Sequence, residues 1–253
     1  MKLFCVGLGW LGKLVQETAE KKGVRMNGTT TNGRDETTPW KIGDAVPKEV
    51  NGCSVLVSIP ASKWANHQLT QFLEQLTRFE VSHLVWVSSS GVFTQLGEHD
   101  ETSKPFKGVG ERSDRLIAQE ELVKKYFPNA AIIRLVGLFG YDRHPARYFT
   151  ERSIPNPDAK ANMIHGADAA KVCFNALTAR WKGVIHGVPP ELPSRKLFYV
   201  QAFRYLELGT PTFEEENNAK TIVSKRLGNE LIIDWSYSNP IHAYEVENRD
   251  QHT

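Results

Sequence analysis

The chain has 253 residues, of which 40% are hydrophobic and 24% are charged, and its formal net charge is +2. A chain of this length and composition can bury a sizeable core, as globular proteins do. The small net charge gives no basic surface of the kind that binds nucleic acid, and no apolar segment approaches the roughly 20 residues that span a bilayer. We therefore expect neither nucleic acid nor a membrane as a partner.

The opening stretch MKLFCVGLGW lacks the layout of a secretory signal peptide, because glycines interrupt its apolar run and no small-residue cleavage site follows. The three cysteines, Cys5, Cys53 and Cys173, are odd in number and far apart in the sequence. We expect them to be buried thiols of a cytoplasmic protein rather than a disulfide framework or a reactive site. No Cys/His spacing predicts a metal site.

The first motif, GLGWLG, follows the apolar run Lys2–Val6 and precedes a helical pattern that ends at Gly23. It fits G-x-G-x-x-G in the context that dinucleotide binding requires: a tight turn, a close approach of the backbone to a pyrophosphate, and close packing of helix on strand. The free N–H groups of the helix N-terminus would face the pyrophosphate. The motif predicts a dinucleotide site. A tight turn without ligand, and a site for another nucleotide-like ligand such as the methyl donor of methyltransferases, are the alternatives. The residues expected to bind the dinucleotide are Gly7, Gly9, Trp10, Leu11 and Gly12.

The end of the second apolar run, Val24–Thr29, bears on the choice between NAD and NADP. An Asp or Glu there would bind the 2′-hydroxyl of the adenosine ribose, whereas an Arg without an acid accommodates the 2′-phosphate of NADP. Thr30 stands about where the acid would be, Arg34 is close by, and no carboxylate appears before Asp35. The pattern favours NADP over NAD. The alternative is that Arg34 is a solvated loop charge.

Apolar runs continue to alternate with segments of helical periodicity up to about residue 140. The runs that predict further strands are Ser54–Ile59, His83–Ser88 and Ala130–Val136, and the helical patterns between them are Leu69–Phe79 and Arg112–Phe127. This alternation predicts an α/β fold with a Rossmann-like, doubly wound parallel sheet covered by helices on both faces. The polar stretch 30–52 predicts a loop with a short strand near Lys41–Asp44.

The alternation of apolar runs with helical patterns ends after Gly140, although Asp168–Arg180 has a helical pattern. We therefore expect two parts. Residues 1–165 would form the NAD(P)-binding Rossmann domain. Residues 166–253 would form a small irregular C-terminal lobe that covers the substrate, with parts packing back on the first domain.

The stretch VSSSGVF, Val87 to Phe93, ends the fourth apolar run with three hydroxyl groups. With it, five segments resemble the extended branch of the short-chain dehydrogenase/reductase superfamily, the NAD(P)-dependent epimerase/dehydratase family. The other four are VGLGWLG, LVSIPAS, IIRLVGLFG and NMIHGADAAK, and together they span roughly the first 170 residues. The resemblance implies an oxidoreductase or an epimerase/dehydratase that acts on sugar-like substrates, including nucleotide-linked ones. It also implies cofactor contacts at Ile59, Pro60 and Ser88.

In that family a serine or threonine three positions before the Val-Tyr pair bonds the substrate oxygen that is oxidised or reduced. Counting back from Val92 and Phe93, this residue is Ser89. The alternative is that its hydroxyl only satisfies N–H groups of the loop at the strand end.

The chain departs from the family at the Tyr-x-x-x-Lys pair, whose Tyr transfers the proton. Neither residue is present on the helix after the serine strand, where Glu111 and Arg115 occupy the two positions. Arg115 could bind the nicotinamide ribose as a permanent cation, and Glu111 could act as acid or base if it were desolvated. The alternatives are a helix N-terminal carboxylate and a surface charge.

Other polar residues follow the last core strand. Arg143 and His144 in YDRHPARYF would suit a phosphate or carboxylate of the substrate, unless this is an ordinary solvated loop. We expect Asp168 to cap the following helix and His165 to be structural. Further on, Ser194 or Arg195 is a candidate for contact with an anionic end of the substrate.

The leading interpretation is an NADP-dependent oxidoreductase or epimerase-like enzyme with a sugar-like substrate. The alternative is a dinucleotide-binding redox sensor or regulatory protein without turnover, because some superfamily members that lack the Tyr and Lys are of this type. Residue ranges Asn66–Phe79 and Arg112–Phe127 are candidate faces for a homodimer by family likeness.

Overall fold

The apolar runs of the sequence form one parallel sheet in the computed structural model, which describes residues 1–216 and 219–250. The seven strands are ordered β11-β7-β5-β4-β1-β2-β3, and each pairs in parallel with its neighbours. The predicted doubly wound α/β fold is confirmed. The strands are β1 (Leu3–Val6), β2 (Met26–Thr30), β3 (Thr38–Pro39), β4 (Ser54–Val57), β5 (His83–Ser89), β7 (Ala131–Leu135) and β11 (Gly183–Gly187).

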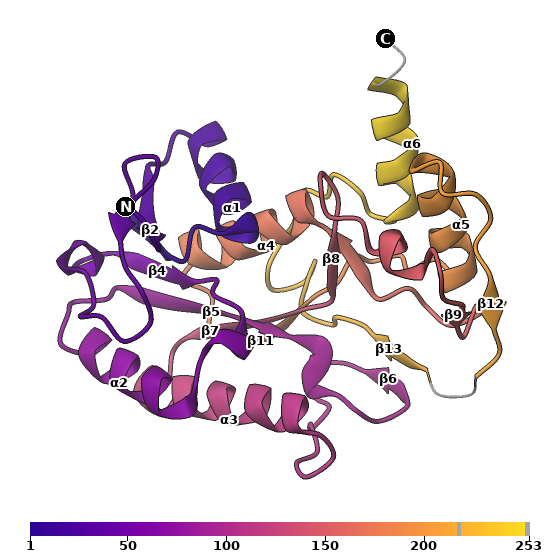
Figure 1. Cartoon of the computed structure of the whole chain (residues 1–253). Coiled ribbons are helices and arrows are strands. Elements are labelled where there is room, and N and C mark those ends of the chain that lie inside the picture. Colours follow the sequence, from indigo (N-terminus) through magenta and orange to yellow (C-terminus); the bar gives the residue numbers. More distant parts are fainter. Residues whose placement is uncertain (217–218, 251–253) are drawn as a thin grey trace.

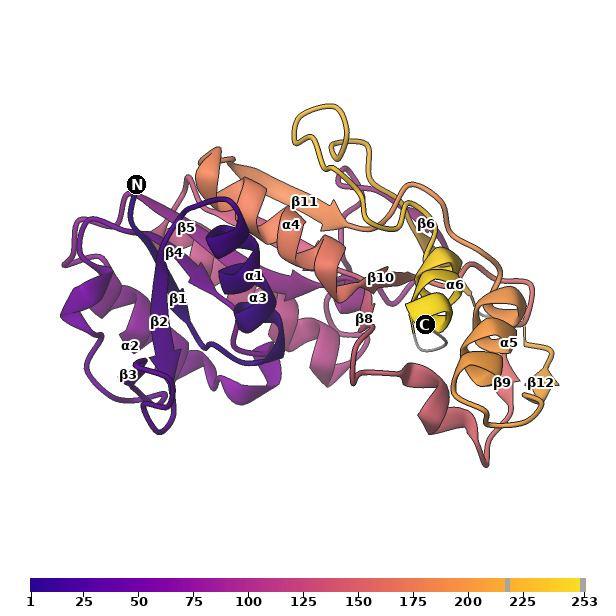
Figure 2. The same cartoon turned by 90° about the horizontal axis from the view of Figure 1, so that it is seen from above.

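Helices cover both faces of this sheet (Figure 1). Helices α1 (Trp10–Lys21) and α4 (Gly166–Thr178) pack together on one face, and α2 (Asn66–Leu76) and α3 (Glu111–Tyr126) pack on the other. The view from above shows α1 and α4 side by side over the strands (Figure 2).

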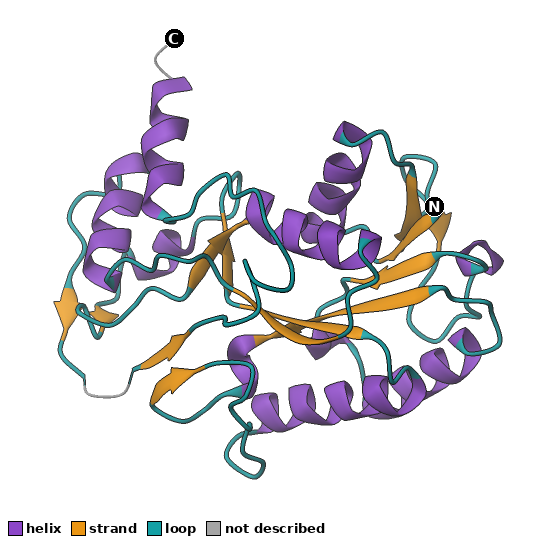
Figure 3. Ribbon diagram, turned by 180° about the vertical axis from the view of Figure 1, so that it is seen from behind, coloured by secondary structure: helices purple, strands orange, loops and turns teal. Residues whose placement is uncertain are grey.

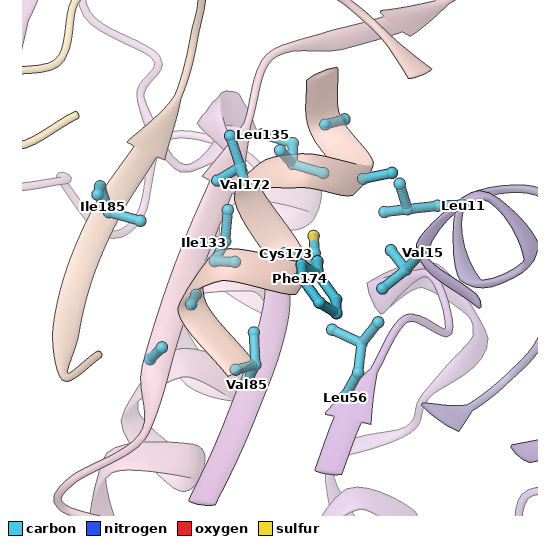
Figure 4. Packing of buried hydrophobic residues seen from close by; sticks show 14 of the residues in the cluster. Leu11, Val15, Leu56, Val85, Ile133, Leu135, Val172, Cys173, Phe174 and Ile185 are labelled. Atoms are coloured by element: carbon cyan, nitrogen blue, oxygen red, sulfur yellow. The ribbon is translucent and has the colours of Figure 1, made fainter. Parts of the chain in front are cut away.

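The central strands β1, β4, β5 and β7 are buried on both faces, so successive side chains enter different cores. In β5, Leu84 and Trp86 belong to the core under α2 and α3, whereas Val85 belongs to the core under α1 and α4. Figure 4 shows the second of these cores, with Val15 of α1 and Phe174 of α4 facing side chains of four strands. This two-sided burial explains why the runs are continuously apolar rather than alternating.

The prediction of a short strand near Lys41–Asp44 is wrong. The edge strand is β3, at Thr38–Pro39. Residues Lys41–Asp44 form a turn, in which the Asp44 N–H donates to the Lys41 carbonyl at 3.0 Å and the Lys41 N–H donates to the Asp44 carboxylate at 2.8 Å. An Asp that bonds the backbone a few residues away favours a turn over a strand.

The C-terminal part forms a lobe beside the carboxyl edge of the sheet (Figure 3). Its core joins aromatic side chains of α5 (Arg195–Tyr205) and α6 (Ile241–Asp250) to Phe139. Apart from the central sheet, the described residues form two-stranded parallel ribbons: β10 (Met163–His165) with β8 (Gly137–Phe139), β12 (Phe213–Glu214) with β9 (Ile154–Pro155), and β13 (Lys220–Ile222) with β6 (Gly97–His99). Four short 3-10 helices are η1 (Lys48–Val50), η2 (Ala61–Lys63), η3 (Ser90–Val92) and η4 (Pro145–Phe149).

Helix α4 and strand β11 lie after residue 165, yet both belong to the layers of the central sheet. The domain boundary at that residue stays a prediction.

The cysteines are buried free thiols, as expected. Burial raises the pKa of the Cys5 thiol to about 12, so this group stays protonated and unreactive at neutral pH. Among the described residues, no helix has the length and apolar character needed to cross a membrane.

His83 predicts how the fold responds to acid. Burial, and then the charges of Arg180 and Lys182, lower its pKa from 6.5 to about 4. Between these values the unfolded chain takes up a proton that the folded chain does not, so the free energy of unfolding falls as the pH falls from 6.5 to 4. We expect His83→Gln to reduce this slope in urea denaturation measured at a series of pH values. The exposed His67→Gln is the control, and equal slopes in His83→Gln and the wild type would contradict the assignment.

Candidate functional site

The glycine loop connects the carboxyl end of β1 to α1 at the edge of the sheet where the ends of β4, β5 and β7 also lie (Figure 2). Gly7 has a φ of +94°, and its N–H donates to the Thr29 hydroxyl at 2.9 Å. The Ser58 hydroxyl donates to the Gly7 carbonyl at 2.5 Å. A methyl group on Gly12 would lie 2.6 Å from that same carbonyl oxygen. The first and third glycines are therefore required by the turn and by the packing of α1.

Gly9 differs from the other two glycines because it faces open space. A methyl group there would meet no atom within 4 Å. Gly9 is the N-cap of α1, no side chain caps the helix, and the first turn carries no acid. The helix N-terminus therefore presents N–H groups and a partial positive charge to an open region, which fits the pyrophosphate of a dinucleotide.

Ile59 and Pro60 follow β4 beside this loop. A methyl group on Gly7 would lie 2.5 Å from the Ile59 side chain, so Ile59 packs directly under the turn. Pro60 is exposed and begins the η2 turn. Both lie at the carboxyl edge of the sheet, where sequence resemblance predicts cofactor contacts.

The turn after β2 carries Thr30 and Arg34. The Thr30 and Thr37 hydroxyls lie 2.6 Å apart, and the Thr37 hydroxyl also donates to the Arg34 carbonyl. The Arg34 side chain is exposed and donates to the Asn32 side chain at 3.1 Å. Asp35, the first carboxylate of this turn, faces Lys13 at 3.5 Å. The rim of the site at β2 thus holds hydroxyls and an exposed guanidinium.

Trp10 and Leu11 begin α1. Leu11 is buried in the core under α1 and α4. The Trp10 indole donates to the Asp142 carboxylate at 2.8 Å, and the Arg143 guanidinium lies 5.3 Å from the centre of the Trp10 ring. A methyl group on Gly166 would lie 2.5 Å from this indole. Trp10 therefore joins the glycine loop to the loop after β8 and to the start of α4.

Arg143 and His144 do not form the common anion site expected from the sequence. Arg143 stacks on Trp10, whereas His144 is buried in the lobe, 5.5 Å from Tyr205 and 6.2 Å from Tyr244 between ring centres. Adjacent side chains in an extended stretch point in different directions. Arg143 and His144, in the stretch that precedes η4, therefore contact different parts of the protein.

The three serines at the end of β5 also separate. Ser88 shares its face with Leu84 and Trp86, and its hydroxyl donates to the Glu120 carboxylate at 2.6 Å. Glu120 accepts from Arg134 at 3.0 and 2.8 Å, and all three side chains are buried. The hydroxyl of Ser88 is thus closed to a ligand, so a cofactor contact at Ser88 would not use this side chain.

Ser89 points to the other face and is half-buried. Its hydroxyl oxygen accepts the Gly91 N–H at 3.1 Å and so caps η3. Because this bond uses an acceptor site, the Ser89 O–H remains able to donate to a substrate oxygen.

Glu111 and Arg115 form an ion pair at 2.6 Å on the first turns of α3. The Glu111 side chain is 90% exposed and that of Arg115 is 33% exposed. Phe93 is buried, stacked on His99 with ring centres 4.6 Å apart. Glu111 therefore lacks the desolvation that a proton-transferring carboxyl needs, and its position is that of an N-terminal helix carboxylate.

Lys220 is a residue that sequence reasoning missed. Its ammonium donates to the carbonyls of Ser90 at 3.1 Å and Phe93 at 2.6 Å, across 130 residues of sequence. Burial, and then the charge of Arg112, lower the pKa of Lys220. No local pattern marks this lysine, because its contacts arise only when β13 pairs with β6.

His165 has a structural role, as expected, whereas Asp168 does not cap the helix. His165 is the N-cap of α4, and its Nδ1 accepts the Ala167 N–H at 3.2 Å. Asp168 lies inside the helix and accepts the N–H groups of Ser236 at 2.6 Å and Tyr237 at 3.0 Å. The expected helix cap at Asp168 is therefore wrong, because this carboxylate holds the C-terminal segment against α4 instead.

No family model matches the chain. Protein YeeZ of Escherichia coli K12 is 25% identical over 95% of this chain and 97% of its own length. A protein of unknown function from Silicibacter pomeroyi has a TM-score of 0.81 at 18% identity, over 98% of both chains. UDP-glucuronic acid 4-epimerase from Bacillus cereus, solved with NAD, has a TM-score of 0.74 at 14% identity, over 97% of this chain and 96% of its own. Human SDR39U1, solved with NADPH, has a TM-score of 0.66 at 15% identity, over 85% and 82%.

The chain has the fold of the extended short-chain dehydrogenases/reductases. The resemblance inferred from the five sequence segments is thereby confirmed at the level of the fold. The two residues that the sequence resemblance matches to the family's Tyr-Lys pair, Glu111 and Arg115, lie on the first turns of α3.

The glycine loop yields a paired prediction. Gly9→Val adds a side chain where nothing lies within 4 Å, so its free energy of unfolding should stay within about 1 kcal/mol of the wild type. It should nevertheless abolish binding of NADPH in a fluorescence titration, because the side chain fills the space of the pyrophosphate. Gly12→Ala should instead lose about 1–3 kcal/mol of stability by overpacking. Unimpaired NADPH binding by Gly9→Val would exclude this loop as the site.

The buried Glu120–Arg134 pair yields a second prediction. Glu120→Gln leaves the Arg134 guanidinium buried without its charge partner, which should reduce the free energy of unfolding by about 3–5 kcal/mol. The exposed Glu121→Gln on the same helix is the control and should change it by less than about 1 kcal/mol. Urea denaturation measures both, and equal values for the two variants would contradict a structural role of the buried pair.

Proposed function

We propose that the protein is an NADP-dependent oxidoreductase or epimerase/dehydratase-like enzyme that acts on a sugar-like substrate. The observation that carries the proposal is the open N-terminus of α1 at Gly9, at the same sheet edge as the half-buried hydroxyl of Ser89. The proposal is supported by structural neighbours solved with NAD or NADPH, and by MoeE5, solved with UDP-glucose and NAD.

The preference for NADP over NAD is supported by the rim of the site at β2. Thr30 bonds Thr37 rather than a carboxylate, and the exposed Arg34 can reach an anion near the ribose. A carboxylate at Thr30 would repel the 2′-phosphate, and none is present there.

The bound dinucleotide would supply or accept the hydride at its nicotinamide ring. The chain would hold the pyrophosphate on the N–H groups of Gly9 and Trp10, and Ile59 and Pro60 would border the ring at the end of β4. The Ser89 hydroxyl, oriented by the Gly91 N–H, would donate a hydrogen bond to the substrate oxygen. Arg115, one-third exposed, would offer a permanent cation toward the ribose.

The second candidate function is dinucleotide sensing without turnover. It is favoured by the 90% exposure of the Glu111 side chain and by the burial of Phe93. Substitutions at Ser89 and Glu111 distinguish catalysis from sensing without turnover. Under catalysis, Ser89→Ala should lower the rate of hydride transfer at unchanged NADPH affinity, and Glu111→Gln tests the carboxyl in the same assay. If both variants turn over like the wild type, neither residue takes part in the mechanism.

The proposal also includes a cytoplasmic location and a homodimer formed through the exposed faces of α2 and α3.

The cofactor preference has a direct test. Energy transfer from tryptophans, among them Trp10, to the reduced nicotinamide should report tight NADPH binding and weak NADH binding. Arg34→Gln should weaken NADPH binding about tenfold and leave NADH binding unchanged, because a charge-assisted bond to the 2′-phosphate is lost. Arg25→Gln, at the opposite end of β2, is the control. An equal loss for both dinucleotides would contradict the assignment of Arg34.

A further inference from the structure

Strand β13 brings a lysine of the C-terminal part to the turn that follows Ser89. The Lys220 ammonium donates to the carbonyls of Ser90 at 3.1 Å and Phe93 at 2.6 Å. Ser90 is the first residue of η3, and Phe93 is the residue that follows its end. In Figure 1, β13 and β6 lie between α3 and the lobe that carries α5. The lysine therefore reaches the serine turn from a strand outside the central sheet.

The η3 turn is held at both of its ends. At its start, the Ser89 hydroxyl oxygen accepts the Gly91 N–H at 3.1 Å. At its end, the Phe93 N–H donates to the Ser90 carbonyl at 3.2 Å, and the Lys220 ammonium bonds this carbonyl and that of Phe93. The last carbonyls of a helical turn lack partners within it, and a cation can satisfy them. Lys220 therefore caps the end of the turn whose start is capped by Ser89.

The side chain of Phe93 anchors the end of the turn in the protein interior. Its ring is stacked on His99 with ring centres 4.6 Å apart, and the Arg134 guanidinium lies 5.2 Å from its centre. All three side chains are buried. Because the Lys220 ammonium bonds two carbonyls at once, it ties the residue directly after Ser89 to this anchored position.

The charge of Lys220 is directed to the turn. In residues 1–216 and 219–246, no carboxylate lies within ion-pair distance of its ammonium. Burial, and then the charge of Arg112, lower its pKa, so the ammonium is partly removed from water. A hydrogen bond from a charged donor is roughly twice as strong as one between neutral groups. The two carbonyls are therefore strong partners for this cation.

The strand that carries Lys220 is itself fixed. The Asn162 amide donates to the Lys220 carbonyl and accepts the Ile222 N–H, both at 2.8 Å. Asn162 directly precedes β10, and β13 also pairs with β6. A continuous set of contacts thus runs from the C-terminal part of the chain through Lys220 to the residue after Ser89.

We propose that Lys220 is a positioning residue for the reaction, which holds η3 so that the Ser89 O–H is directed at the substrate oxygen. A hydrogen bond weakens steeply as its angle departs from linear, and a small displacement of a reacting group lowers the rate strongly. The reacting end of the site is therefore complete only when β13 is docked. That Ser89 meets a substrate rests on the proposed function, whereas the support of the turn by Lys220 does not.

Hydrogen–deuterium exchange of the full chain tests whether Lys220 holds the turn. Lys220→Met keeps most of the apolar stem and removes the ammonium. The amides of segment 90–93 should then exchange about tenfold faster, because two charge-assisted hydrogen bonds are lost. The amides of α2 should exchange at the wild-type rate. Lys220→Arg supplies a permanent cation to the same carbonyls and should restore slow exchange of segment 90–93.

The control is Lys124→Met, which makes the same substitution at an exposed lysine of α3. Three results overturn the proposal: wild-type exchange of segment 90–93 in Lys220→Met, an equal acceleration in α2, which indicates a general loss of stability, or no rescue by Lys220→Arg. If Lys220→Met does not fold, Asn162→Ala decides the question, because it loosens β13 and leaves the ammonium in place. It should accelerate exchange of segment 90–93, and a wild-type rate there overturns the proposal.

Hydride-transfer kinetics connect the turn to Ser89. Lys220→Met should lower kcat about tenfold at unchanged NADPH affinity. Because Lys220 acts through Ser89, the double variant Ser89→Ala/Lys220→Met should be no slower than Ser89→Ala, and multiplied losses would overturn the positioning role. NADPH titration of the wild type reports on the proposed function separately. Failure to bind NADPH would contradict that function and leave the exchange result intact.

Discussion

The close approach of α1 to the ends of β1 and β4 is the constraint on which the site depends. The third glycine lies against the carbonyl of the first, and the hydroxyl of Ser58 bonds that same carbonyl. Together these contacts fix where α1 begins and where its N-terminal N–H groups point. Gly9, between them, is the one glycine of the three whose missing side chain leaves open space. The three glycines of the motif therefore have different roles. Gly7 and Gly12 are needed by the fold, and Gly9 is available to a ligand.

The charged groups near β5 and α3 also fall into two sets, one that is structural and one that is accessible to a ligand. The buried Ser88–Glu120–Arg134 network lies beneath β5 and is a structural element, closed to ligands. On the accessible side, the first turns of α3 carry the Glu111–Arg115 ion pair.

The central strands could be predicted from sequence because they are buried on both faces, whereas the short edge strand β3 is partly exposed and its position was not predicted. The glycine loop could be predicted because its residues are contiguous. The separation of Ser88 from Ser89 follows from strand alternation: Leu84, Trp86 and Ser88 share one face. Lys220 could not be found in this way, since its partners lie about 130 residues away and no short pattern records the pairing of β13 with β6. The role of Asp168 also depends on a distant segment, because the N–H groups that it binds belong to Ser236 and Tyr237.

A crystal structure of the chain grown with saturating NADPH tests the central claim most directly. The account predicts the pyrophosphate over Gly9 at the N-terminus of α1, the 2′-phosphate near Arg34, and the nicotinamide ring between Ile59 and Ser89. Density for the dinucleotide elsewhere, or a glycine loop left empty at saturating NADPH, would contradict it.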